Sequence, residues 1–189
     1  GKIVIESQPR KHTRFRWVLR DGTALVFIDQ RRFGSVELLS NVDCQNRFQK
    51  LGAEPWPAYR DGAWYRRRWG KSKGSIKSTM LKQEHVAGIG NIMASEICFR
   101  MGIDPRISCE RLNERDWEAL GVELHRFVEA VLEEESSPEI AFVSQGGALP
   151  KAFLVYGRNG QSCGCGTIIQ VMKQAGRSTY WCPRCQVSR

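Results

Sequence analysis

The first 40 residues alternate between apolar and polar positions, as β-strands with one apolar face do. Phe15, Trp17 and Leu19 alternate with three arginines and a valine, which predicts a strand. Asp21-Gly22 then separates this run from a second one, and this dipeptide is a strong hairpin signal because both turn positions favour a positive φ. The strands predicted in this way span residues 2–5, 14–20, 24–28 and 35–39.

Beyond residue 40 the spacing of apolar residues becomes helical. Along the longest such segment they recur every three or four positions, and Asn113 with Asp116 predicts the cap at its start. Asn91 is a good N-cap residue and predicts the start of another helix after a glycine-rich break at 88–90. The predicted helices are a short one soon after residue 41, one around 76–81, one from 91 to about 102, and one from about 114 to 135.

This order of elements predicts an α+β protein in three parts. We expect residues 1–40 to form antiparallel strands and residues 41–150 to form a helical domain. Residues 151–189 hold a cysteine-rich hairpin. Residues 136–150 are rich in Ser, Pro and Gly, so we expect a loop there.

Composition narrows the range of partners. The 189 residues include 29 Lys and Arg against 20 Asp and Glu, which gives a net charge of +9. A basic surplus on a folded chain indicates a polyanionic partner, with nucleic acid ahead of a membrane surface. The apolar runs are only a few residues long, so we expect no membrane span. A basic protein without such a partner remains the alternative.

Four of the seven cysteines crowd the end of the chain with the spacing of a zinc ribbon. Cys163 and Cys165 are followed, after sixteen residues, by Cys182 and Cys185. Four thiolates close a tetrahedral shell around zinc, and such sites are structural. The first pair is one residue tighter than the usual two-residue spacing. We predict one structural zinc; two disulfides or an empty site are the alternatives.

Three short segments have residues suited to phosphate or base contacts. Arg177 follows a glycine at a predicted hairpin tip, where a guanidinium can meet a phosphate. The Gly-Ile-Gly-Asn turn ending at Asn91 exposes backbone N–H groups at a helix start. Arg31, Arg32 and Phe33 place an aromatic ring after two cations, as in wedges that enter a base stack. Solvated arginines and a core phenylalanine would give the same patterns, and the basic run at 66–77 fits a solvated face.

Taken together, these segments resemble the formamidopyrimidine-DNA glycosylase/endonuclease VIII family of base-excision repair enzymes, along nearly the whole chain. The resemblance implies a β-sandwich, a helix–two-turns–helix DNA-binding domain and a zinc finger. The Arg-Arg-Phe-Gly motif favours the formamidopyrimidine branch, whose substrates are oxidised purines such as formamidopyrimidine and 8-oxoguanine. The segments that carry the resemblance are 10–12, 29–34, 73–77, 86–96, 155–158 and 176–186.

The resemblance also implies roles for residues that contact DNA at the lesion. His12 and Lys73 would bind phosphates near it. Arg31 would fill the gap left by the extruded nucleotide, and Phe33 would wedge the stack beside it. Base chemistry inside a duplex requires flipping, which costs a few kcal/mol, and a wedge with phosphate clamps offsets that cost.

Further roles implied by the resemblance fall in the helical domain and the finger. Lys77 and Asn91 would hold phosphates at the helical turn. Arg177 would grip a phosphate from the zinc finger and assist the final elimination. The expected partner is duplex DNA with a damaged or abasic site, bound by a monomer in the cytoplasm, at the nucleoid of a bacterial cell.

The chain departs from the family at the catalytic residues. The family's nucleophile is an N-terminal proline amine with a glutamate beside it, which forms a Schiff base with the sugar. This chain begins at Gly1, so we expect it to lack the N-terminal half of the first domain and to be inactive alone. Gln30, where proline is usual, and the compressed loop at 136–150 also depart.

Three functions compete on these grounds. The first is a DNA glycosylase/AP lyase for oxidised purines, here without its nucleophile. The second is a non-catalytic, zinc-dependent protein that binds damaged DNA. The third is a zinc-ribbon factor for RNA or the ribosome, which would show no preference for abasic duplex.

Overall fold

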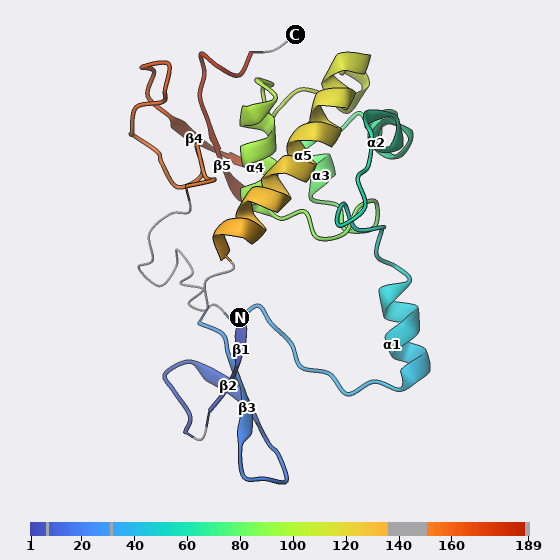
Figure 1. Ribbon diagram of the computed structural model, residues 1–189, viewed down its shortest axis with the longest axis vertical. Helices are drawn as coiled ribbons and strands as arrows, with labels where there is room; N and C mark the ends of the chain where they lie inside the picture. The colour runs from blue at the N-terminus through green and yellow to red at the C-terminus, as the bar shows by residue number, and fades with distance from the viewer. Residues whose placement is uncertain (7, 31, 136–150, 188–189) are drawn as a thin grey trace. The chain divides into compact units, whose positions relative to one another are not determined.

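The computed structural model describes residues 1–6, 8–30, 32–135 and 151–187, and it has two compact units, Gly1–Arg47 and Phe48–Arg189. The first unit contains a small antiparallel sheet, and the second contains most of the helices and a C-terminal β-hairpin (Figure 1). The predicted α+β class is therefore confirmed.

The sheet of the first unit consists of β1 (Lys2–Ile5), β2 (Thr13–Val18) and β3 (Ala24–Ile28). The three strands are antiparallel, in the order β1-β3-β2. Ala24 and Val26 of the central strand are buried. Phe15 and Trp17 lie opposite Phe27 and Leu25 in the neighbouring strand, and they remain 42% and 57% exposed. The predicted apolar face is therefore present, as one face of a single sheet.

Two details of the predicted sheet are wrong. The β2–β3 connection is longer than a two-residue turn, because the Leu19 N–H donates to the Thr23 carbonyl beyond the strand ends. Gly22 has a φ of 85°, whereas Asp21 has no positive φ, which fits a type I turn followed by a left-handed glycine. Residues 35–39 form no strand. Although apolar and polar residues alternate there, the segment is largely exposed, and Leu38 is 96% exposed.

A short helix, α1 (Asn41–Phe48), follows the sheet as predicted and has no buried residue. The second helix, α2 (Gly62–Trp69), was not predicted from the sequence. Its amphipathic pattern is short, but Tyr65 and Trp69, four residues apart, are fully buried. The Asp61 side chain accepts the Trp64 N–H and caps the helix.

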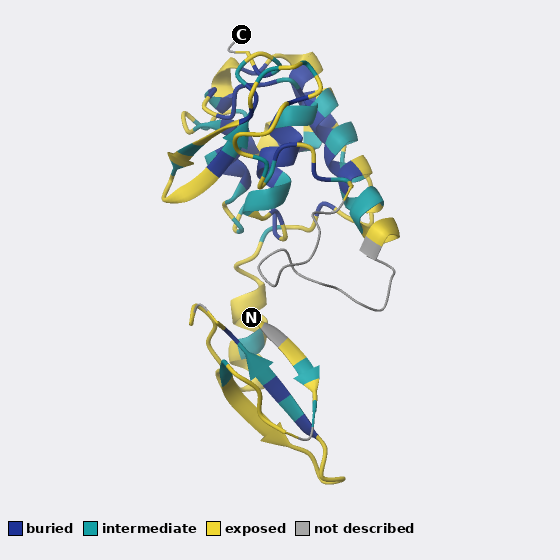
Figure 2. Ribbon diagram, turned by 90° about the vertical axis from the view of Figure 1, so that its left-hand side faces the viewer, coloured by how far each residue is buried: buried dark blue, intermediate teal, exposed yellow. Residues whose placement is uncertain are grey.

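The core of the second unit forms around the long helix α5 (Glu114–Glu135), which has the predicted bounds. Asn113 and Asp116 cap its start reciprocally: each side chain accepts the backbone N–H of the other residue. Helices α2 and α5 approach closely because glycines lie at their contact. A Cβ at Gly121 would lie 2.7 Å from the Arg60 carbonyl oxygen. The stripe of α5 that faces the core is buried, as Figure 2 shows.

The second unit contains further elements beside α2 and α5. They are α3 (Ile76–Met80), α4 (Asn91–Arg100), a 3₁₀ turn η1 (Cys109–Arg111) and the hairpin strands β4 (Gln170–Gln174) and β5 (Arg177–Trp181). Helix α4 packs against α3, α5 and β5. In the described part of the chain, no helix combines the length and apolar character needed to cross a membrane. The predicted loop at 136–150 lies outside the described residues.

Candidate metal centre and nucleic-acid interface

The four C-terminal cysteines converge on one point. All four Sγ atoms lie within 4.8 Å of one another. The Cys163–Cys185 and Cys165–Cys182 sulfur pairs are 3.8 and 3.6 Å apart, and none of these cysteines forms a disulfide. A tetrahedral Zn–S₄ centre with bonds of about 2.3 Å requires sulfur–sulfur separations of about 3.8 Å. The cluster fits one structural zinc.

A turn at Gly166 allows the shortened first cysteine pair to reach the cluster. Gly166 has a φ of 83°, and its N–H donates to the Cys163 carbonyl in a tight turn. Hydrogen bonds from the Thr167 hydroxyl and N–H lower the pKa of Cys165 to about 6. The crowded Cys185 thiol, hydrogen-bonded to Cys165, has its pKa raised to about 12. A divalent cation removes this difference between the two pKa values, because it holds all four sulfurs as thiolates.

Asn91 joins three elements at the start of α4. Its amide oxygen accepts a hydrogen bond of 2.6 Å from the Lys77 amine of α3, and its amide nitrogen donates over 2.8 Å to the Ser178 carbonyl of β5. The sequence prediction that Asn91 caps the helix is wrong. The N-cap is Gly90, which has no capping side chain, so the Asn91 side chain is free to bridge α3 and β5.

Arg177 stands beside this junction at the hairpin tip. Ala175 and Gly176 both have a positive φ, and Gln174 pairs with Arg177, as in a two-residue hairpin turn. Arg177 is exposed, as predicted. We name the group of Lys77, Asn91 and Arg177 the junction cluster. It brings an amine, an amide and a guanidinium from three elements to one place.

Lys77 is the buried member of the junction cluster. The residue has no exposed surface, and its amine lies behind Asn91 rather than at the surface. Burial, with a smaller contribution from the positive charge of Arg177, lowers the pKa of Lys77 to about 8. The predicted role in phosphate binding would therefore act through its charge and through the orientation of Asn91.

This pKa predicts that DNA affinity depends on pH. Since a phosphate favours the protonated amine, binding should weaken as pH rises through about 8. The dissociation constant should increase about tenfold between pH 7 and pH 9 if only the protonated form binds. Fluorescence anisotropy at constant ionic strength measures this. The Lys77→Gln variant should bind weakly at both pH values, and a tenfold step that persists in that variant would contradict the assignment.

The remaining predicted DNA contacts are spread over both units. Lys73 is exposed in the loop before α3. In the first unit, the carbonyl of His12 accepts the Asp29 N–H, and the Asp29 carboxylate accepts the Gly34 N–H. These bonds hold the loop that carries Phe33, which is 84% exposed. Arg31 lies outside the described residues.

Sequence analysis missed three polar residues that position the hairpin, of which Glu96 and Gln186 are buried and Gln174 is half-buried. The Glu96 carboxylate accepts three backbone N–H groups from residues 154–156. Gln174 donates to the Ser75 hydroxyl and the Pro105 carbonyl. Gln186 accepts the Cys182 N–H and donates to the Ile103 carbonyl. In the sequence, Glu96 is visible only as an acid in an apolar segment and Gln186 as a polar residue after the last cysteine, and nothing marks Gln174.

Family models match both parts of this site. Residues 51–140 match the model described as the formamidopyrimidine-DNA glycosylase H2TH domain, where H2TH denotes helix–two-turns–helix. Residues 165–187 match the model described as a zinc finger found in FPG and IleRS. The second match begins at Cys165, so the shifted Cys163 falls outside it.

Comparisons of the whole chain with known proteins identify the same family as the two family models. The chain is 34% identical over 201 residues to a formamidopyrimidine-DNA glycosylase of Cronobacter sakazakii, covering 98% of this chain and 71% of that protein. It is 36% identical over 181 residues to that of Geobacillus kaustophilus, covering 93% and 66%. The Lactococcus lactis Fpg in complex with DNA containing an abasic site superposes with a TM-score of 0.83 at 30% identity, covering 99% and 72%. This chain is therefore a member of the formamidopyrimidine-DNA glycosylase family.

Proposed function

We propose that the protein is a base-excision repair DNA glycosylase and AP lyase that acts on oxidised purines in duplex DNA. The observation that carries the proposal is the junction cluster, in which Asn91 links α3 to β5 within hydrogen-bonding distance on both sides. Such an arrangement of polar and cationic groups suits a DNA phosphate. The zinc site, at the end of β5 opposite to Arg177, holds the hairpin that presents this residue.

The substrate class rests on the relatives and on one loop. The Arg-Arg-Phe-Gly motif that ends at Gly34 resembles the formamidopyrimidine branch. Among the similar solved structures are a Lactococcus lactis Fpg with DNA containing Fapy-dG and a MutM with DNA containing carbocyclic 8-oxo-G. The exposure of Phe33 fits a side chain that wedges into a base stack. A protein with these substrates would work at the chromosomal DNA.

We further propose that these 189 residues by themselves bind damaged duplex without cleaving it. Neither the family's proline amine nor the glutamate beside it has a counterpart among the segments of this chain that carry the resemblance. Borohydride trapping on a duplex with one abasic site, beside a binding titration, tests this. Binding without an adduct is the expected result. A covalent adduct would show that an amine within these residues is the nucleophile, and no binding to abasic duplex would overturn the proposed function.

Two variants should separate affinity from damage recognition. Arg177→Ala removes a phosphate contact, so we expect about tenfold weaker binding to intact and abasic duplex alike, with a salt slope smaller by about one. Arg31→Ala should reduce the preference for abasic duplex and leave the affinity for intact duplex within about twofold. Anisotropy titrations on both duplexes at several salt concentrations measure this. Equal loss on both duplexes for Arg31→Ala would contradict the role of that residue at the lesion.

A further inference from the structure

Arginine side chains gather around α2, at a distance from the junction cluster. Arg60 precedes the helix, and Arg67 and Arg68 lie in its second half. Helix α2 packs against α5, α5 against α4, and α4 against β5. Two helices therefore separate these arginines from the zinc hairpin, as Figure 1 shows with α5 between α2 and β5.

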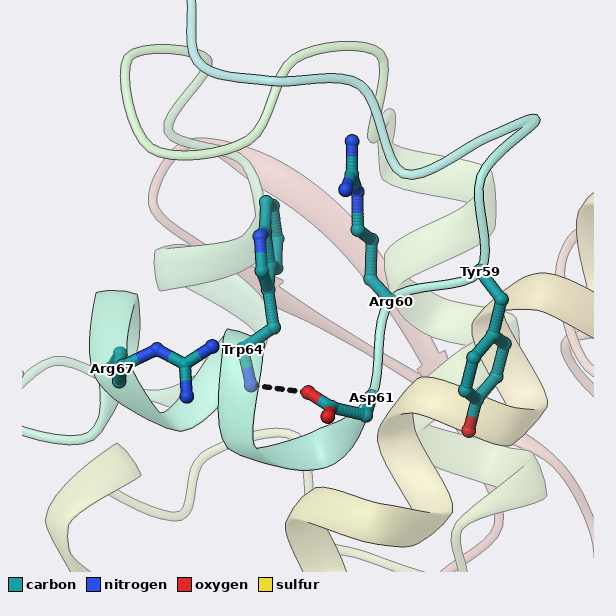
Figure 3. A pocket seen from close by; sticks show the side chains of 5 residues that line it. All are labelled: Tyr59, Arg60, Asp61, Trp64 and Arg67. Atoms are coloured by element: carbon teal, nitrogen blue, oxygen red, sulfur yellow. Dashed lines mark hydrogen bonds between the residues drawn. The ribbon is translucent and has the colours of Figure 1, made fainter.

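The arginines are organised by one aromatic ring. The Arg68 guanidinium carbon lies 3.4 Å from the centroid of the Trp64 ring, and that of Arg60 lies 5.2 Å from it. Arg68 also donates to the Trp64 carbonyl. Figure 3 shows the Arg60 side chain extended beside the indole. A guanidinium that contacts an aromatic face keeps N–H groups at its edge for an anion.

Arg60, Arg67 and Arg68 form no ion pair with an acid in the part of the chain that the structure describes. Among the described residues, Arg66 is the one arginine of α2 with an ion-pair partner, Glu114 at 3.4 Å. The Arg60 Nε atom is buried without a hydrogen-bond acceptor in the same part of the chain. Partial burial, followed by the charges of Arg67 and Arg60, lowers the pKa of Arg68. The cluster therefore holds like charges close together, and an anion bound among them would offset this repulsion.

The surface between these side chains is hollowed. The hollow has a volume of about 240 Å³ and is lined by residues of α2 and of the segment before it (Figure 3). The carboxylate of Asp61 is turned to the helix, where it accepts the Trp64 N–H over 2.7 Å. The lining residues are Tyr59, Arg60, Asp61, Trp64 and Arg67.

The chemistry favours a nucleic-acid backbone over an acidic peptide. A peptide usually anchors through apolar side chains in a desolvated pocket. Here the arginines contact the central indole, so the hollow offers few free apolar surfaces for such an anchor. Phosphates need only guanidinium edges and positive charge, both of which the hollow supplies.

We propose that Arg60, Arg67 and Arg68, arranged around Trp64, form a second nucleic-acid site that binds the backbone phosphates of a duplex other than the one at the junction cluster. One chain would then hold two duplex segments at once. This site does not depend on the repair chemistry proposed above, because it uses no residue of the junction cluster or of the zinc centre.

A bridging assay tests the second site. The full chain is first bound to a biotinylated 15-base-pair abasic duplex on streptavidin beads, and a fluorescent intact duplex of equal length is then added. The wild type should retain the second duplex. Arg60→Gln with Arg67→Gln should reduce its retention at least fivefold and change binding of the first duplex less than twofold. The matched control is Lys50→Gln with Arg126→Gln, which removes the same charge from exposed positions outside both sites.

Every outcome of the bridging assay either supports or overturns the second nucleic-acid site. Retention by the wild type and the control, together with its loss in the Arg60/Arg67 variant, supports the site. Equal retention by all three proteins, or none by the wild type, overturns it. Displacement of the second duplex by poly-glutamate at a lower charge concentration than by competing duplex would overturn it in favour of an acidic protein partner. If the abasic duplex fails to bind, the proposed function fails; direct titration with intact duplex then tests the second site through the same variants.

Discussion

Replacing Cys182 with serine is expected to abolish zinc binding and to unfold the β4–β5 hairpin. Cys182 is fully buried, and its sulfur lies in the four-cysteine cluster. Structural zinc contributes on the order of 10 kcal/mol to the folding of such small domains, which is more than the few surrounding apolar residues supply. Metal analysis should find one zinc in the wild type and less than about a tenth of one in the variant.

DNA binding should be lost together with the zinc. Arg177 and the Ser178 carbonyl, which accepts a hydrogen bond from Asn91, both lie on β5. An unfolded hairpin therefore removes one member of the junction cluster and the group that holds another in place. We expect an affinity loss of about a hundredfold or more. Cys44→Ser is the control, since Cys44 lies on α1 outside the cluster and should leave one zinc bound. Freshly purified, reduced wild type without zinc would refute the assignment of the metal centre.

Glu96→Gln is expected to have the second largest effect, a decrease in the free energy of unfolding. The carboxylate has no exposed surface and accepts the N–H groups of Leu154, Val155 and Tyr156 at 2.8, 2.9 and 2.7 Å. A glutamine keeps one oxygen acceptor and turns an N–H₂ group toward a backbone N–H. Charge-assisted bonds are weakened and a buried donor loses its partner, so we expect about 2–4 kcal/mol less free energy of unfolding.

A matched surface carboxylate provides the control for Glu96. Glu134 accepts the N–H groups of Lys151 and Ala152 at 2.6 and 3.1 Å, but it is exposed to water. Its replacement by glutamine should cost less than about 1 kcal/mol, because water can satisfy the groups that lose their partner. Urea denaturation of both zinc-loaded variants measures the difference. Equal costs at the two positions would show that burial of Glu96 does not govern the stability of this contact.

Much of the fold was predictable because local patterns decide it. The long helix has the predicted bounds since its apolar stripe and its Asn113–Asp116 cap are both local signals. The prediction of a strand at residues 35–39 was wrong for the opposite reason. Alternation alone does not make a strand when no neighbouring strand pairs with it. Helix α2 was missed since Tyr65 and Trp69 gain their burial from the core, where α2 packs against α5, a contact remote in sequence.

The candidate site likewise has one part that the sequence predicted and another that it could not predict. The cysteine spacing predicted the metal centre, because short loops bring paired thiols together wherever the hairpin lies. The bridge from Lys77 through Asn91 to Ser178 was not predictable, since its ends are separated by about a hundred residues and meet only when α3, α4 and β5 pack. The partners of Glu96 likewise lie 58 to 60 residues away.

The sequence by itself determined the α+β class, the hairpin turn that exposes Arg177, the family resemblance and the zinc ligands. Each of these depends on residues that are close together in the chain or on motifs that survive as short strings. Only the tertiary structure decided which polar groups are buried and which partners satisfy them. Burial of Lys77 and Glu96 is a property of the packed helices, and the pKa of the one and the hydrogen bonds of the other follow from that packing.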